Sequence, residues 1–217
     1  MTSDYFDLPS ALLEAGAVRF SPDTPFTWAS GLKSPVYCDN RQLLGFPYVR
    51  AAVSLALCAS VKENNKGATL IAGTSTAGIP WASMVADRLG LPLAYARPEP
   101  KKHGMGRQVE GPLVGKHRVV LIEDLISTGG SSLKCVEALR DEGAEVLEVL
   151  ALFSYGLSKA DSAFESKNVP WRALAVFSDL VKRAVETGAV APSGQESLAV
   201  WREDPQAWSD RFAQRRD

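Results

Sequence analysis

Residues 119–143, VVLIEDLISTGGSSLKCVEALRDEG, decide the fold. The stretch begins with an apolar strand that ends in two carboxylates, Glu123 and Asp124. A short loop of serine, threonine and glycine follows, and a helix then runs from residue 131 to a stop at Gly143. In an open parallel sheet, ligands bind beyond the carboxyl ends of the strands, so this order predicts a binding site at residues 123–131.

The alternation of strand and helix continues on both sides of this stretch. Apolar runs bounded by turn residues predict five strands, over residues 68–74, 91–97, 117–124, 144–155 and 171–178. Stretches that start near a proline or a polar cap and end at glycine or asparagine predict four helices, over residues 46–65, 79–90, 131–143 and 178–188, the last capped by Ser178 or Asp179. We therefore expect an α/β fold with right-handed crossovers and a central parallel sheet flanked by helices on both faces.

Residues 1–45 do not follow this rhythm. They contain one predicted helix, near residues 7–16, and a turn-rich stretch, so we expect a small N-terminal hood within the same domain. We assign residues 46–200 to the α/β core and residues 201–217 to a C-terminal helix or tail.

The composition is that of an ordinary globular domain and excludes several classes of protein. The 217 residues are 46% hydrophobic and 23% charged, and 24 basic against 25 acidic residues give a net charge of −1. This charge balance argues against binding of nucleic acid over the whole surface. The sequence contains no run of about 18 apolar residues, so we expect no membrane-spanning helix. The start of the chain lacks the pattern of a secretory signal. Three scattered cysteines, Cys38, Cys58 and Cys135, fit free thiols in a reducing cytoplasm.

The loop at residues 125–130 has the chemistry of a phosphate site. A helix N-terminus offers free N–H groups, Gly129 and Gly130 allow close backbone approach, and the neighbouring hydroxyls add donors (Ser127, Thr128, Ser131 and Ser132). The two acids would repel a phosphate, so they are suited to bind sugar hydroxyls or a divalent cation instead. A ribose 5-phosphate fits both parts of the segment, with its hydroxyls at the acids and its phosphate at the loop. The alternative is a structural capping turn with solvated acids. Neither a GxxxxGK[ST] nor a GxGxxG pattern is present.

Two further stretches have the character of anion sites. Residues 97–111 carry a local charge of +3 between Arg97 and Arg107, contain three glycines, and place His103 beside two lysines. Such a loop could close over a departing diphosphate, although a solvated surface loop is the alternative. Residues 72–80, AGTSTAGIP, follow a predicted strand and open a helix, and they form a weaker candidate cradle (Gly73, Thr74, Ser75, Thr76 and Gly78).

The segment LIEDLISTGGSS, residues 121–132, resembles the phosphoribosyl-diphosphate signature of the type I phosphoribosyltransferases. The resemblance to the orotate phosphoribosyltransferase family covers nearly the whole chain, through residues 26–41 (FTWASGLKSPVYCDNR), 72–80 and 96–111 (ARPEPKKHGMGRQVEG). It implies transfer of the 5-phosphoribosyl group of 5-phospho-α-D-ribose 1-diphosphate to orotate, in pyrimidine biosynthesis. It also implies a Mg²⁺ cofactor held through the donor and water, and a homodimer in which the mobile loop 97–111 reaches the neighbouring subunit's site.

The resemblance assigns roles to residues of this chain. Catalysis falls to Arg97, Lys101 and His103. The implied donor-binding residues are Arg97, Lys101, Lys102, His103, Glu123, Asp124, Leu125, Ile126, Ser127, Thr128, Gly129, Gly130 and Ser131, with Thr74, Ser75 and Thr76 against the diphosphate. The implied orotate-binding residues are Tyr37, Cys38, Arg41 and Ser127. For Arg41, a two-pronged contact with the orotate carboxylate and a surface ion pair are equal alternatives.

The chain also departs from the family pattern. Ala29 and Pro98 stand where some relatives have lysine, and Lys159 is the only cation near the place where some have an arginine after the strand at 144–155. His117 and the five tryptophans are expected to be structural. Two rival functions remain: transfer to another base such as a purine, and a non-catalytic regulator that binds nucleic acid. The stretches FTWASGLKSP and KKHGMG argue against the first, and the retained loop cations Lys101 and His103 argue against the second.

Overall fold

A six-stranded sheet forms the centre of the computed structural model, which describes residues 6–28, 31–100, 107–112 and 114–214. The strands, in spatial order, are β10 (Trp171–Val176), β9 (Glu145–Ser154), β8 (Arg118–Ile126), β5 (Leu70–Thr74), β6 (Leu93–Ala96) and β7 (Val109–Glu110). Neighbouring strands run parallel, except that the short edge strand β7 is antiparallel to β6. The predicted parallel sheet is therefore confirmed, with an antiparallel edge.

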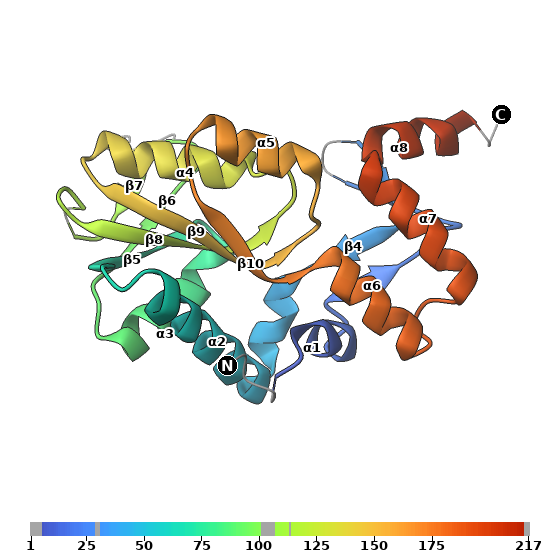
Figure 1. Cartoon of the computed structure of the whole chain (residues 1–217), viewed down its shortest axis with the longest axis horizontal. Coiled ribbons are helices and arrows are strands. Elements are labelled where there is room, and N and C mark those ends of the chain that lie inside the picture. The colour runs from blue at the N-terminus through green and yellow to red at the C-terminus, as the bar shows by residue number, and fades with distance from the viewer. Residues whose placement is uncertain (1–5, 29–30, 101–106, 113, 215–217) are drawn as a thin grey trace.

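Helices cover both faces of the sheet (Figure 1). Helices α2 (Pro47–Asn64) and α3 (Gly78–Leu89) pack on one face, and α4 (Gly130–Asp141) and α5 (Ser158–Ser166) pack on the other. Side chains alternate along a strand, so Val120 and Ile122 of β8 join one hydrophobic cluster, whereas Val119 and Leu121 join the other. A strand that is buried on both faces has a continuous run of apolar residues, so these strands could be predicted from the sequence.

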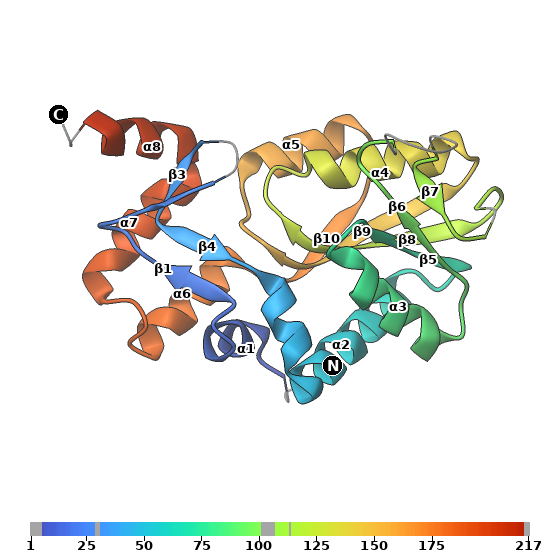
Figure 2. The same ribbon diagram turned by 180° about the vertical axis from the view of Figure 1, so that it is seen from behind.

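The hood and the C-terminal helices form one end of the molecule (Figure 2). The hood contains α1 (Leu8–Glu14), the antiparallel pair β1 (Val18–Phe20) and β4 (Val36–Cys38), the pair β2 (Phe26–Thr27) and β3 (Lys33–Ser34), and a 3₁₀ helix (Asn40–Gly45). Beside it lie α6 (Phe177–Glu186), α7 (Pro192–Glu203) and α8 (Pro205–Gln214). The backbone N–H of Lys33 donates to Ser209 Oγ at 3.0 Å, and Arg183 pairs with Asp7 at 2.5 Å.

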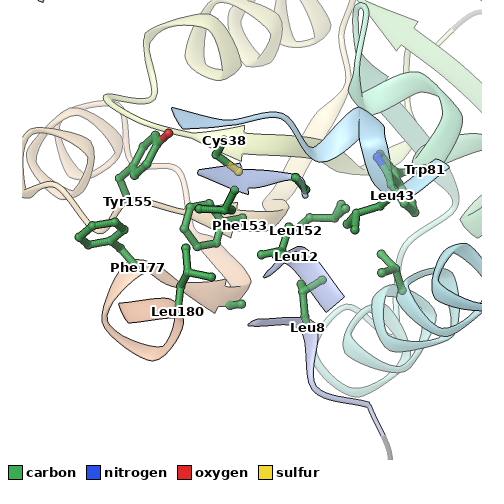
Figure 3. Close-up of a cluster of buried hydrophobic side chains, with 14 of the residues drawn as sticks. Leu8, Leu12, Cys38, Leu43, Trp81, Leu152, Phe153, Tyr155, Phe177 and Leu180 are labelled. Atoms are coloured by element: carbon green, nitrogen blue, oxygen red, sulfur yellow. The ribbon is translucent and has the colours of Figure 1, made fainter. Parts of the chain in front are cut away.

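One hydrophobic cluster joins the hood to the sheet. Figure 3 shows Leu12 of α1 and Leu43 of the 3₁₀ helix gathered around Leu152 and Phe153 of β9. All four side chains are fully buried, so separating the hood from the sheet would expose a large apolar area to water. The hood therefore has a fixed position over the carboxyl ends of the strands.

Several boundaries differ from the prediction. Strand β8 continues to Ile126, so Glu123 and Asp124 lie within the strand rather than at its end. The predicted cap of α6 is wrong: Val176 is the N-cap, because the buried Phe177 already belongs to the helix and places Ser178 and Asp179 in its first turn.

Two helices were not predicted. They are α5, which buries only Ala160 and Phe164 along its length, and α7, which precedes the expected C-terminal helix α8. In the part of the chain that the structure describes, no helix combines the length and apolar character needed to cross a membrane.

Candidate active site

Glu123 lies at the centre of a hydrogen-bond cluster that joins three elements. Its side chain is buried, and its Oε1 accepts hydrogen bonds from Thr74 Oγ1 of β5 at 2.6 Å and from the Asp124 N–H at 3.0 Å. Its Oε2 accepts a hydrogen bond from Ser132 Oγ of α4 at 2.7 Å. These bonds fix the ends of β5 and β8 against the start of α4, and the predicted contact of Glu123 with ribose remains a prediction.

Glu123 and Asp124 influence each other's ionisation. Burial, followed by the neighbouring Asp124 carboxylate, raises the pKa of Glu123 from its ordinary value of 4.5 to about 8. Burial also raises the pKa of Asp124, while hydrogen bonds with Glu123 and with backbone N–H groups oppose that rise. Since two adjacent buried carboxylates repel each other, the pair favours a single negative charge near neutral pH.

The loop after β8 opens an anion site at the N-terminus of α4. Gly129 has a φ of 79°, and a Cβ there would lie 2.5 Å from a ring carbon of Phe164, so this position requires glycine. Thr128, Gly130 and Ser131 are exposed to solvent. The first N–H groups of a helix have no intrahelical acceptor, and at this exposed turn they face solvent; phosphate binding here remains a prediction.

The loop after β5 lies beside this site. Thr74 ends the strand, Ser75 and Thr76 follow with a cis peptide bond between them, and α3 begins at Gly78. A Cβ on Gly78 would lie 2.4 Å from Thr74 Oγ1 and 2.5 Å from the carbonyl oxygen of Ile122. Glycine thus allows α3 to start close against β5 and β8, which brings the predicted diphosphate loop next to the acid pair.

These residues line a cavity of about 330 Å³, which we call the acidic cavity. Its lining brings together seven of the predicted donor-binding residues with two of those predicted to bind orotate. The described lining residues are Cys38, Asp39, Arg41, Thr74, Ser75, Thr76, Ala77, Pro98, Glu123, Asp124, Leu125, Ser131 and Cys135. Hydroxyl groups and carboxylates dominate this wall, as expected for a phosphorylated sugar.

Arg97 brings the start of the predicted mobile loop to the acidic cavity. It follows β6, and its Nη1 donates to Ser75 Oγ at 3.4 Å, while its guanidinium lies 5.5 Å from the ring centroid of Tyr95. The next residue, Pro98, lines the cavity itself. Lys101, Lys102 and His103 lie outside the described residues.

The two ends of this loop are fixed. Glu99 forms an ion pair with Lys134 of α4, and the Arg97 N–H donates to the Gln108 carbonyl at 2.8 Å beside the β6–β7 pair. Both ends of the loop therefore leave the sheet beside the acidic cavity.

A second cavity, of about 340 Å³, adjoins the first and shares Cys38 and Leu125 with it. We call it the aromatic cavity, and its described lining residues are Thr27, Trp28, Tyr37, Cys38, Leu125, Ser127 and Tyr155. Tyr37, Cys38 and Ser127 were predicted to bind the base. Thr27, Trp28 and Tyr155 were not, and Tyr155 could have been found from its place at the carboxyl end of a predicted parallel strand.

Asn40 connects the hood to the acid pair and was not predicted. It is almost completely buried, accepts a hydrogen bond from Cys38 Sγ at 3.1 Å, and donates from Nδ2 to the Asp124 carbonyl at 2.6 Å. Burial raises the pKa of the Cys38 thiol, so Cys38 meets a ligand as a neutral group. The chain Cys38–Asn40–Asp124 holds the boundary between the two cavities.

Arg41 forms the ion pair that was one of its two predicted alternatives. Its Nε donates to Asp39 Oδ1 at 2.6 Å and its Nη2 donates to Oδ2 at 3.0 Å, and its side chain is 62% exposed. The Arg41 guanidinium lowers the pKa of Asp39 through these contacts. Arg41 lines the acidic cavity rather than the aromatic one, and its contact with a substrate carboxylate remains a prediction.

Comparison with known proteins agrees with this geometry. Residues 51–189 match the model of the phosphoribosyl transferase domain family. The chain is 49% identical over 198 residues to "Orotate phosphoribosyltransferase" from Bacillus pumilus, which covers 91% of this chain and 93% of that protein. Its fold matches a crystal structure of orotate phosphoribosyltransferase from Aeropyrum pernix, with 33% identity, a TM-score of 0.74, and coverage of 85% of this chain and 100% of the other.

A second solved structure, of UMP synthase from Leishmania donovani, matches with 28% identity and a TM-score of 0.76. This match covers 90% of the present chain and 41% of the Leishmania chain. The family model of residues 51–189 contains the acid pair and the anion loops. The hood and α7–α8 lie outside that model, although Trp28 and Tyr37 of the hood line the aromatic cavity.

Proposed function

The chain belongs to the orotate phosphoribosyltransferase family, and from this membership and its two cavities we propose its reaction: transfer of the 5-phosphoribosyl group from 5-phospho-α-D-ribose 1-diphosphate to orotate. The products are orotidine 5′-phosphate and diphosphate, in pyrimidine biosynthesis. The observation that carries the proposal is the junction of an acidic and an aromatic cavity at Cys38 and Leu125. A glycosidic bond between a phosphorylated sugar and a planar base forms across such a junction.

The acidic cavity accounts for the donor. The exposed N-terminus of α4 binds the 5-phosphate, and Ser75 and Thr76 face the diphosphate. Asp124 holds the ribose hydroxyls, and its negative charge stabilises the positive charge that develops on the ribose as the anomeric bond to diphosphate breaks. Glu123 keeps these groups in place through its bonds to Thr74 and Ser132.

The leaving diphosphate requires positive charge. Arg97, at the start of the loop, is already bonded to Ser75 of the diphosphate loop, and Lys101 and His103 follow it in the sequence. We include Mg²⁺ as a cofactor that would bind through oxygen atoms of the donor and through water, because this hard cation prefers oxygen ligands and commonly binds through substrate phosphates. When bound, Mg²⁺ offsets the charge on the departing diphosphate.

The aromatic cavity accounts for the base. Trp28, Tyr37 and Tyr155 offer ring surfaces for a planar pyrimidine, and Ser127 offers a hydroxyl. Burial raises the pKa of Tyr155, so its phenol stays neutral and can donate a hydrogen bond. The N1 of orotate attacks the anomeric carbon directly, so the reaction needs no protein nucleophile.

We also propose a homodimer in which loop 97–111 reaches the neighbouring subunit's site. Three large apolar side chains are exposed at the N-cap and in the first half of α2: Phe46 at 45%, Tyr48 at 79% and Leu55 at 56%. Exposed apolar groups that gather on one helix are typical of a surface that binds another protein. The three free, buried cysteines support a place in the reducing cytoplasm.

The function is tested by following the loss of orotate absorbance with Mg²⁺ and 5-phospho-α-D-ribose 1-diphosphate. The expected result is turnover with orotate and none with adenine or hypoxanthine under the same conditions. Turnover with a purine but not with orotate would establish the rival base specificity. No turnover with any base would instead support the non-catalytic regulator.

A further inference from the structure

Trp201 of α7 connects the C-terminal helices to the aromatic cavity. Its side chain is completely buried, and it lies outside the residues that match the domain family. Its ring centroid lies 5.7 Å from that of Trp28 and 5.4 Å from that of Tyr155, and both pairs meet nearly at right angles. Trp201 therefore touches two rings that line the cavity while it is not itself among the described lining residues.

The two lining rings depend on this contact for their orientation. Trp28 directly follows β2 of the short β2–β3 pair and is only partly buried, and its Nε1 donates a long hydrogen bond, of 3.4 Å, to the Val36 carbonyl. Trp28 and Tyr155 also contact each other at 5.3 Å, so Trp201 closes a triangle of three rings. Phe177 of α6 supports Trp201 from a further side at 5.3 Å.

The C-terminal helices hold Trp201 against the hood. Ser209 of α8 accepts the hydrogen bond of the Lys33 N–H in β3, the strand that pairs with the end of β2. Figure 2 shows α7 and α8 beside β3 and β4, at the end of the molecule where the hood lies. The C-terminal segment thus acts on the hairpin that carries Trp28.

We propose that Trp201 is a positioning residue for the base: it holds the rings of Trp28 and Tyr155 in the orientation that receives a planar pyrimidine. This inference rests on the proposed function, because it takes orotate as the occupant of the aromatic cavity. The described lining of the acidic cavity contains no aromatic ring. Removing Trp201 should therefore weaken the binding of orotate and spare that of the phosphoribosyl donor.

The test is steady-state kinetics of Trp201→Leu and Trp201→Phe in the full-length protein, with each substrate varied at saturating concentration of the other. Since edge-to-face ring contacts contribute beyond their buried area, we expect Trp201→Leu to raise the KM for orotate about tenfold. The KM for the donor should change less than about twofold, because the acidic cavity is intact. Trp201→Phe keeps a smaller aromatic ring at this position and should raise the KM for orotate only about threefold.

Trp208→Leu is the matched control. Trp208 lies on α8, is also a buried tryptophan of the C-terminal segment, stacks on Phe212 at 5.5 Å, and is not among the described residues that line the aromatic cavity. It should lower the melting temperature and leave both KM values unchanged. An unchanged KM for orotate in Trp201→Leu would overturn the proposal, and so would equal rises in both KM values.

If Trp201→Leu does not fold, Trp201→Phe decides by the same criterion. An unchanged KM for orotate in that variant overturns the proposal, and a selective rise supports it. Turnover of the wild-type protein distinguishes failure of the proposed function from failure of the role proposed for Trp201. Absence of orotate turnover there rejects the proposed function, whereas normal wild-type turnover with unaltered variants rejects only the role of Trp201.

Discussion

Glu123 shows how one buried side chain organises the site. A carboxyl group loses favourable hydration when it is buried, and three hydrogen-bond donors from β5, β8 and α4 compensate part of that loss. The same donors would otherwise be free to bind a ligand. Thr74 and Ser132 hold Glu123 in place, while Asp124, Ser75 and Ser131 line the acidic cavity.

Glu123 should make the stability of the protein depend on pH. Its pKa in the folded state, about 8, lies above its ordinary value, so the folded protein binds this proton more tightly than the unfolded chain does. The resulting stability is present at low pH and is lost as the pH rises toward 8; Asp124, whose pKa is also raised, acts in the same direction. The free energy of unfolding of the wild type, relative to Glu123→Gln, should fall by on the order of 1 kcal/mol per pH unit between about pH 5 and 8.

Urea unfolding of both proteins at pH 5, 6, 7 and 8 measures this difference. If the free energies of unfolding of the wild type and of Glu123→Gln differ by the same amount at all four pH values, Glu123 keeps the same charge in the folded and unfolded states. The pH dependence assigned to the acid pair would then be wrong.

At the residue scale, the sequence predicts the candidate site residues that lie within one local motif. It does not predict those that reach the site through contacts with residues far away in the sequence. Glu123, Asp124 and the hydroxyls around Gly129 follow from one strand–loop–helix pattern. Asn40 bonds to Asp124, 84 residues away, and nothing in the sequence predicts that pairing. Trp28 was expected to be structural, and it both packs against Trp201 and lines the aromatic cavity.

At the element scale, the segment between β6 and β7 contains the lysines that we propose to act on the leaving diphosphate. Lys101→Ala should lower kcat at least about tenfold, since it removes a cation that stabilises the leaving diphosphate in the transition state. Lys66→Ala, at an exposed position between α2 and β5, is the control and should leave kcat unchanged. Equal rates for the wild type and Lys101→Ala would remove this lysine from the mechanism.

The predicted strands and helices of the core were confirmed because their patterns are strong. Strands buried on both faces are continuous apolar runs, and proline or glycine marks the ends of α2 and α3. The pattern is weak where an element buries little, as in α5, whose nine residues include two buried side chains. The end of β8 was placed too early because two acids normally end a strand, whereas Asn40, Thr74 and Ser132 bond with the Glu123–Asp124 pair here.

At the scale of the whole molecule, residues from both ends of the chain build or support the aromatic cavity, our proposed base site. The hood contributes Trp28 and Tyr37, the loop after β9 contributes Tyr155, and Trp201 of α7 packs against Trp28 and Tyr155. The α/β core was predictable from the sequence, because neighbouring elements repeat one local pattern. The meeting of the hood with α6–α8 was not, because it depends on contacts between segments 176 residues apart, such as Lys33 with Ser209 and Asp7 with Arg183.

The exposed face of α2 leads to a prediction about assembly. Leu55→Glu places a charge in the proposed interface, so it should shift the protein from dimer to monomer in analytical ultracentrifugation and lower kcat, because each site then lacks its neighbour's loop. Ser162→Glu, at an exposed position on α5, is the control and should remain dimeric and active. A dimeric, fully active Leu55→Glu would place the interface elsewhere.

The division of the site into two adjoining cavities is tested most directly by a crystal structure of the protein with bound orotidine 5′-phosphate. We predict the pyrimidine ring in the aromatic cavity against Trp28 and Tyr155, the ribose beside Asp124, and the phosphate on the N-terminal turn of α4 at Thr128 and Ser131. A nucleotide whose base lies outside the aromatic cavity, or whose phosphate lies away from α4, would contradict this assignment.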